Sequence, residues 1–138
     1  MTYDLERFVT AQDQGGTYNA ALAELRRGRK TGHWMWFVFP QIAGLGLSPT
    51  SQHYAISSLD EARAYLAHPV LGPRLLTCAR TVADRKESAA QLLGGIDAQK
   101  LRSSMTLYGR ADPGEPVFAA VLARCFDGAE DPATLVRL

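Results

Sequence analysis

The sequence predicts an all-α protein, a single compact domain over residues 1–138 with about seven or eight short helices. Three observations support this prediction. Apolar residues recur at spacings of three and four in one segment after another, which is the period of a helix with one buried face. No two segments show the alternation of apolar and polar residues that paired strands require. Proline, glycine and short polar residues interrupt the chain at close intervals, which marks helix starts and ends.

Two helices are expected before residue 30. Asp4 is the expected N-cap of the first helix, which ends near the glycine pair at 15–16. Thr17 could cap the second helix, which ends at Gly28. A basic cluster surrounds this end and comprises Arg26, Arg27, Arg29 and Lys30. Cations in a last helical turn interact favourably with the macrodipole, which explains the cluster without any partner.

The apolar run at 33–39 fits either a buried strand or a buried helix by its periodicity. We favour a helix, because an isolated strand would leave its backbone groups unpaired. Pro40 ends this element. The glycines at 44 and 46 then permit backbone angles that are closed to other residues. Ser48 followed by proline has the pattern of an N-cap at the start of a further short helix.

Two capping-box spacings appear in the middle of the chain. Ser58 and Glu61 have the first, at the start of a helix that a His–Pro pair closes at 68–69. The next helix begins at Pro69 or Pro73 and reaches about residue 84. Ser88 and Gln91 then repeat the spacing before a short helix that the glycine pair at 94–95 stops.

Three helices are expected after the second glycine pair. Asp97 is the best N-cap for the first of them, which should extend to about Tyr108 and be followed by Gly109. Prolines start the other two, which begin at Pro116 and at Asp131–Pro132.

Composition and charge exclude several classes of protein. The net charge of +1 gives no support for nucleic-acid binding. Cys78 and Cys125 lack the spacing of metal ligands, so we expect buried, reduced thiols and no metal site. No secretory signal is present, and no apolar run approaches the roughly 20 residues that span a bilayer. We therefore expect a cytoplasmic protein with no membrane partner. The oligomeric state is not indicated.

The first candidate site follows from the stretch between Gly32 and Tyr54, where an aromatic block leads into a glycine-rich polar loop. Aromatic rings could stack on a ligand, and cations beside a flexible backbone could hold an anion. The candidate residues here are Lys30, His33, Trp34, Trp36, Gln41, Ser48 and His53. Either histidine could equally be a structural residue. No dinucleotide or nucleoside-triphosphate loop pattern occurs, so no cofactor is predicted.

The second candidate group is Lys100, Ser103 and Ser104, which lie close together on a helical wheel. Serines are poor choices for a helix interior, so they indicate close packing against a neighbour or contact with a ligand. Acid–base catalysis could use a histidine or a carboxylate such as Asp97, but the carboxylates considered already have capping roles. No hydrolase motif is present, so no catalytic residue is assigned and enzymatic activity is left open.

Three blocks of the chain resemble a known family. They are Gly-His-Trp-Met-Trp-Phe-Val-Phe-Pro-Gln at 32–41, Ser-Leu-Asp-Glu-Ala with His-Pro-Val-Leu-Gly at 58–72, and Asp-x-x-Lys-Leu-x-Ser-Ser-Met-Thr at 97–106. In them the chain is similar to small bacterial all-α proteins of unknown function, some of which carry the label calpastatin. That label does not suit a chain with a periodic core, since calpain inhibitors are long disordered repeats. A fainter likeness is to the NADAR-type glycosidases of ADP-ribose compounds.

We therefore expect a site for a small anionic ligand that is nucleotide-like or a ribose phosphate, with N-glycosidic hydrolysis as an extension of this hypothesis. The aromatic run should be mostly core, with at most one tryptophan face exposed. Its polar neighbours are expected to meet Lys100 and the two serines across a cleft. The alternative is a non-catalytic protein-interaction module, in which the basic cluster contacts an acidic partner.

Overall fold

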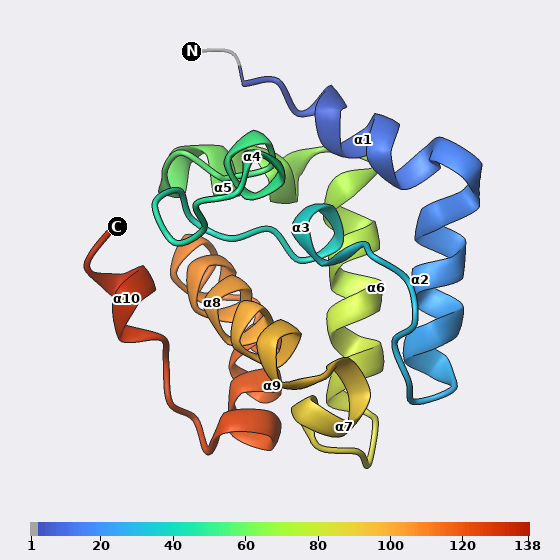
Figure 1. The fold of residues 1–138 in the computed structure, drawn as a ribbon. Helices are drawn as coiled ribbons and strands as arrows, with labels where there is room; N and C mark the ends of the chain where they lie inside the picture. Colours follow the sequence, from blue (N-terminus) through green and yellow to red (C-terminus); the bar gives the residue numbers. More distant parts are fainter. Residues whose placement is uncertain (1–2) are drawn as a thin grey trace.

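Ten α-helices and one short 3₁₀ helix are present in residues 3–138, the part of the chain that the computed structural model describes. In chain order they are α1 (Glu6–Asp13), η1 (Gln14–Gly16), α2 (Thr17–Arg26), α3 (Met35–Val38), α4 (Pro49–His53), α5 (Leu59–Ala67), α6 (Leu71–Ala83), α7 (Ala89–Leu93), α8 (Gly95–Ala111), α9 (Pro116–Phe126) and α10 (Pro132–Leu135) (Figure 1). No strand forms within these residues, which confirms the all-α prediction. The helix number exceeds the predicted seven or eight, because several single turns stand as separate helices.

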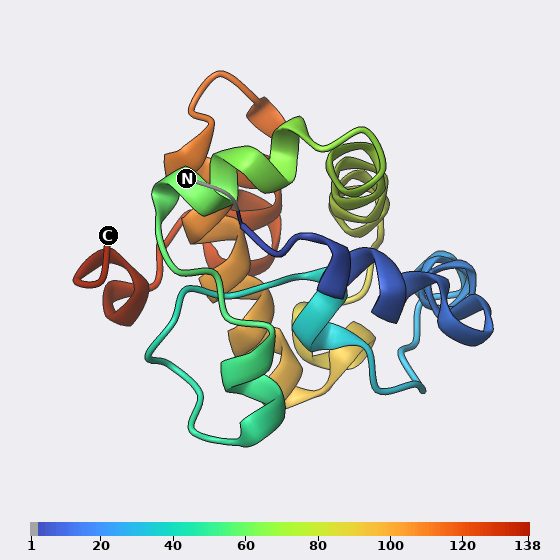
Figure 2. The ribbon, with the colours of Figure 1, turned by 90° about the horizontal axis from the view of Figure 1, so that it is seen from above.

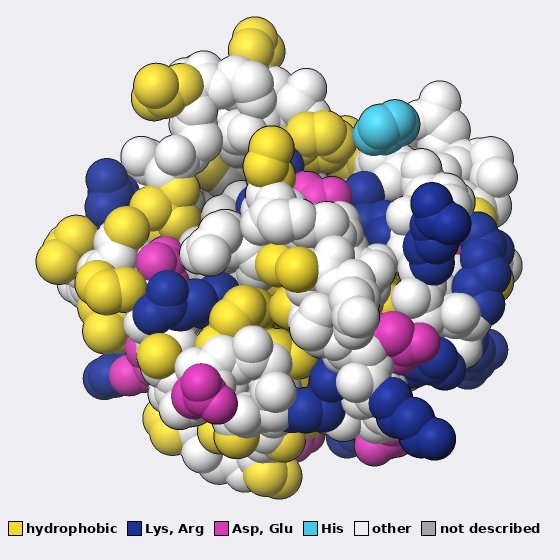
Figure 3. Space-filling view, turned by 60° about the horizontal axis from the view of Figure 1, so that its bottom comes forward, with side chains coloured by type: hydrophobic (Ala, Val, Ile, Leu, Met, Phe, Trp, Pro, Cys, Tyr) yellow, Lys and Arg dark blue, Asp and Glu magenta, His cyan; other side chains and the backbone are white. Residues whose placement is uncertain are grey.

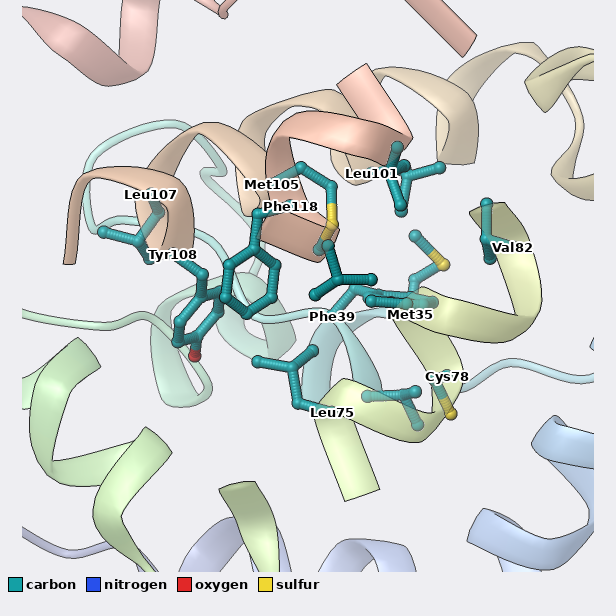
Figure 4. Packing of buried hydrophobic residues seen from close by; sticks show 14 of the residues in the cluster. Met35, Phe39, Leu75, Cys78, Val82, Leu101, Met105, Leu107, Tyr108 and Phe118 are labelled. Atoms are coloured by element: carbon teal, nitrogen blue, oxygen red, sulfur yellow. The ribbon is translucent and has the colours of Figure 1, made fainter. Parts of the chain in front are cut away.

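The longest helix, α8, organises the packing of the single domain. It contacts α5, α7, α9, α10 and α3, while α6 links α9 to α2 on the far side (Figures 1 and 2). Leu101, Met105 and Tyr108 of α8 face Leu75 and Val82 of α6 across the core (Figure 4). All five side chains are almost fully buried. Burial of this apolar surface is the main favourable contribution to folding.

Side-chain caps explain many of the helix starts. Ser48 accepts a hydrogen bond from the Ser51 amide, and Ser88 and Gln91 form the complete capping box that their spacing predicted. Asp131 caps α10, and Glu115 caps α9 immediately before its first proline. These contacts satisfy amides that have no partner within their own helix.

Four predicted caps were wrong in part or in whole. The N-cap of α1 is Leu5 rather than Asp4, and α2 is preceded by Gly16 in the left-handed conformation, so Thr17 is already helical. The Glu61 carboxylate binds the Ser57 amide instead of completing a box with Ser58. Asp97 lies inside the first turn of α8, which begins at Gly95 and continues through Gly109 to Ala111.

The Arg7 side chain joins the N-terminal helix to the segment that follows α4. Its Nε donates to the carbonyl of His53 and its Nη2 to the carbonyl of Ala55, both at 2.9 Å. The same Nη2 lies 3.1 Å from Glu61 Oε2. The segment then hydrogen-bonds to the end of the aromatic block, where Ile56 donates to Gln41 O over 2.9 Å. These bonds hold the glycine loop against the domain.

The two cysteines are free thiols. Cys78 is buried as expected, and burial raises its thiol pKa to about 12, so the thiol stays protonated at neutral pH. Cys125 is half-buried, contrary to the expectation of full burial, because it lies near the solvent-facing end of α9.

Adjacent serines of α8 have opposite environments. Ser103 Oγ donates to Asp131 Oδ2 at 2.9 Å and thereby holds α10 against α8. Ser104 is fully buried, and its Oγ has no hydrogen-bond partner among the described residues. A buried hydroxyl without a partner opposes folding, whereas a bond to a carboxylate favours it.

We predict that Ser104→Ala raises the free energy of unfolding by about 0.5–1 kcal/mol, because it removes the unpaired hydroxyl. Ser103→Ala should lower it by about 1–2 kcal/mol through loss of the bond to Asp131. Both substitutions improve helix propensity equally, so their difference isolates the hydrogen bonding. Urea unfolding followed by circular dichroism measures both values. Equal effects of the two substitutions would contradict the assignment.

Candidate functional site

Trp36 is the centre of the candidate site. It is half-buried and lines three adjacent hollows of the surface. Trp34, two positions earlier, is only 1% exposed and belongs to the core. Trp34 is the N-cap of α3 and Trp36 lies within its single turn, so one tryptophan anchors the block and the other can meet a ligand, as expected for a mostly buried aromatic run.

The first hollow, here called the lysine cleft, has a volume of about 380 Å³. Its lining is formed by Lys30, His33, Met35, Trp36, Leu93, Gly94, Gly95, Ile96, Asp97 and Lys100. Asp97 bridges the two lysines: its Oδ2 lies 2.8 Å from Lys30 Nζ, and its Oδ1 lies 3.3 Å from Lys100 Nζ. The side chains of Lys30, Asp97 and Lys100 are 9%, 19% and 22% exposed, so solvent screens their charges only in part.

Each lysine also lies over a tryptophan ring. Lys30 Nζ is 5.2 Å from the centre of the Trp34 ring, and Lys100 Nζ is 4.5 Å from that of Trp36. An ammonium group is attracted to the negative face of an indole ring. The result is a continuous row in which two Lys–Trp pairs are joined by the Asp97 carboxylate.

Buried Glu24 of α2 sets the course of the chain into this row. Its Oε1 accepts hydrogen bonds from the Thr31 amide at 2.6 Å, the Gly32 amide at 2.7 Å and Trp34 Nε1 at 3.0 Å. Burial favours the neutral acid, but these three donors outweigh it, so the pKa of Glu24 lies below its ordinary value. The Lys30 amide adds a bond to Leu92 O at 2.8 Å, which ties the same loop to α7.

The N-terminus of α8 forms one wall of the lysine cleft. Gly94 ends α7 and directly precedes α8. Its φ of 87° is a backbone conformation that favours glycine. The first bond of the new helix runs from the Ala98 amide to Gly94 O, and α8 has no side-chain cap. The amides of its first turn are therefore available to an anion, and the helix dipole favours negative charge there.

The other two hollows extend the site around Trp36. One, of about 110 Å³, is lined by Gln41 and by Gly44 and Gly46 of the glycine loop. The other, of about 420 Å³, includes both His33 and His53. His33 also lines the lysine cleft, and Tyr54 lines both of the additional hollows, so the three form a connected concave region.

The structure thus brings six predicted site residues to one region: Lys30, His33, Trp36, Gln41, His53 and Lys100. The remaining four lie elsewhere. Trp34 is in the core and Ser48 is an exposed helix cap. Ser103 and Ser104 lie one turn further along α8 than Lys100, where Ser103 is bonded to Asp131 and Ser104 is in the core, so neither lines the lysine cleft.

The sequence predicts other roles, or none, for two further residues of the site. Capping patterns predict that Asp97 is an N-cap, although its i,i+3 spacing to Lys100 also fits an ion pair on one helical face. No motif of the sequence indicates a role for Glu24. An acidic residue next to the apolar face of α2 could have indicated a buried carboxylate. Its partners, however, lie seven to ten residues away in an irregular loop, which no local pattern predicts.

Two features are absent from residues 3–138, a cluster of metal ligands and a membrane-spanning helix. No group of three or more histidine, cysteine or acidic side chains is arranged to hold a metal ion there. None of the helices in that range combines the length and the apolar character that crossing a bilayer demands.

Comparison with known proteins gives a match to the family described as "Protein of unknown function (DUF1810)" over residues 2–138. The chain is also similar to the crystal structure of the conserved hypothetical protein Rv1873 from Mycobacterium tuberculosis, with 50% sequence identity and a TM-score of 0.95. That similarity covers 99% of this chain and 96% of the other. No curated protein matches. The fainter likeness to NADAR-type glycosidases stays a prediction.

The contacts of Glu24 predict how stability depends on pH. Its lowered pKa means that its contribution is fully present above its ordinary value of 4.5 and is lost as the pH falls through the folded-state value. Glu24→Gln should therefore lower the free energy of unfolding by about 2–3 kcal/mol at pH 7. Below pH 4.5 the difference from the wild type should shrink.

Urea unfolding of both proteins at pH 7, 5, 4 and 3 measures this difference. Other carboxyl groups with lowered pKa values, such as those of Glu130 and Asp131, titrate in both proteins and cancel. A difference that stays constant down to pH 3 would show that the Glu24 charge is not what stabilises the loop.

Proposed function

The chain belongs to the family "Protein of unknown function (DUF1810)", and we propose that it binds a small anionic ligand, nucleotide-like or a ribose phosphate, in the lysine cleft. The anionic group of the ligand would lie between Lys30 and Lys100, and its planar or sugar portion would lie against Trp36. This is the function that the geometry of the site supports best.

Two ammonium groups held by one carboxylate carry this proposal. Lys30 and Lys100 come from segments 70 residues apart in the sequence, yet both contact Asp97 in a cleft. Together the three side chains have a formal charge of +1. Charge-assisted hydrogen bonds from ammonium groups to phosphate are among the stronger polar contacts in proteins, and partial burial reduces their screening by salt.

The walls of the lysine cleft supply further contacts of the right kind. The free amides in the first turn of α8 can donate to phosphate oxygens, as helix N-termini do in other anion sites. The half-buried Trp36 ring offers a surface for stacking a base or a ribose. His33 and, in the adjoining hollow, Gln41 could hydrogen-bond to the uncharged part of such a ligand.

A concave site supports ligand binding over the alternative of an interaction module. The exposed basic residues Arg26, Arg27 and Arg29 lie at and beyond the end of α2. Lys and Arg side chains gather on the right of the face in Figure 3, but Asp and Glu side chains lie among them. A surface of mixed sign attracts an acidic partner less strongly than a uniformly basic one.

We predict that nucleotides, ribose 5-phosphate or ADP-ribose raise the melting temperature of the protein. A ligand at about 100 times its Kd should raise it by about 10 °C. Lys100→Met keeps an apolar stem on Trp36 but removes the charge, so it should weaken binding by about tenfold or more. Thermal-shift titrations over a panel of these compounds measure both effects.

The matched control is Lys86→Met, which removes the charge of an exposed lysine that does not line the cleft. It should leave every ligand shift unchanged. If no compound of the panel shifts the melting temperature at millimolar concentration, or if both lysine variants lose affinity equally, the proposed ligand site is refuted.

Hydrolysis of an N-glycosidic bond would need a group that activates water. Asp97 already has both carboxylate oxygens in ion pairs, which favours binding over turnover, so His33 is the base we would assign. If the protein hydrolyses such a bond, chromatography should detect release of the free base, and His33→Ala should slow it by about 100-fold or more. If the compound binds tightly and no free base is released, the protein binds such ligands without hydrolysing them.

A further inference from the structure

The Asp97 carboxylate occupies the place in the lysine cleft that an anionic ligand would take. Both of its oxygens are used, one by each lysine, and it is itself part of the first turn of α8. It therefore makes all three of the electrostatic interactions expected of a bound anion: with Lys30, with Lys100 and with the helix dipole.

A ligand anion cannot add to this arrangement without a change. If Asp97 stayed in place, the incoming anion would meet a carboxylate of like charge a few ångströms away. If Asp97 turned outward, the anion would pair with both lysines in its place, and the cleft would offer a formal charge of +2. Asp97 is 19% exposed, so its carboxylate already borders solvent and can be hydrated there.

We propose that Asp97 is an internal competitor, which occupies the anion position of the unliganded protein and must be displaced by the ligand. This inference rests on the proposed function. A group tethered in this way acts like a ligand at millimolar effective concentration. A simple carboxylate offers no more to the lysines than Asp97 does and lacks the tether, so it competes poorly.

The competitor weakens the binding of every anion by the same factor, so only an anion that the cleft itself binds tightly is retained. An anion with several negative charges and more than two oxygens can contact Lys30, Lys100 and the amides of α8 at once, which Asp97 cannot match. Diphosphates and diphosphate esters have this character. The lysine cleft should accordingly prefer a diphosphate group to a carboxylate or a monoanion.

Asp97→Asn tests this directly, with inorganic pyrophosphate and sulfate as probes. If the carboxylate has to leave before any anion binds, its removal lowers the dissociation constants of both probes by the same factor, about three- to tenfold. Isothermal titration calorimetry at constant ionic strength measures the four dissociation constants. The wild type should bind pyrophosphate more tightly than sulfate, and the ratio should stay the same in the variant.

Asp60→Asn is the matched control. Asp60 also lies in the first turn of a helix and also pairs with a basic residue three positions later, with 3.2 Å between Asp60 Oδ1 and Arg63 Nη1. It does not line the cleft, so its variant should bind both probes as the wild type does. Melting temperatures of both variants show that each is folded.

The outcomes separate the two proposals. Weaker or unchanged binding in Asp97→Asn would mean that Asp97 positions the lysines instead of competing with the ligand. A gain that grows with the charge of the probe would mean that Asp97 stays in place and only repels. Either result overturns the internal competitor and leaves the site intact. If neither probe binds the wild type or the variant, the anion site itself is refuted.

Discussion

The hydrogen bonds of the buried Glu24 carboxylate are the constraint on which the candidate site depends. A buried charge is tolerated only when donors satisfy it, and here the amides of Thr31 and Gly32 and the indole of Trp34 do so. These bonds fix the point at which the aromatic block enters the core. With Trp34 anchored there, the single turn of α3 leaves Trp36 half-buried at the surface.

The start of α8 positions the other part of the site, as the Glu24 hydrogen bonds position Trp34 and Trp36. Because this helix begins at Gly95, Asp97 is a first-turn residue rather than a cap, and its carboxylate is free to reach across the cleft to Lys30. One more turn along the helix, Lys100 is brought over Trp36. The two halves of the site thus meet through ion pairs and ring contacts. The Asp97 carboxylate offsets one of the two lysine charges, so the cleft has a formal charge of only +1.

Pairing with Asp97 explains how a protein of low net charge can keep two lysines close together in one cleft. The net charge of +1 for the whole chain argues against a polyelectrolyte partner, but local charge is what a small ligand meets. The lysines are held in position by Asp97 and by the tryptophan rings, so little reorganisation is needed when another anion replaces the carboxylate. Order in the unliganded state and readiness to bind an anion then have one physical origin.

Periodicity, capping and residue chemistry are read over a few neighbouring positions, so the sequence alone predicts the all-α class, helix starts with local caps such as Ser48 and Ser88, and, as candidates, Trp36 and five residues near it. Tertiary structure decided the rest. The reach of Glu24 to Trp34, the salt bridge from Lys30 to Asp97 and the separation of Ser103 and Ser104 from the cleft depend on how helices pack. Such contacts join distant segments, and no local pattern encodes them.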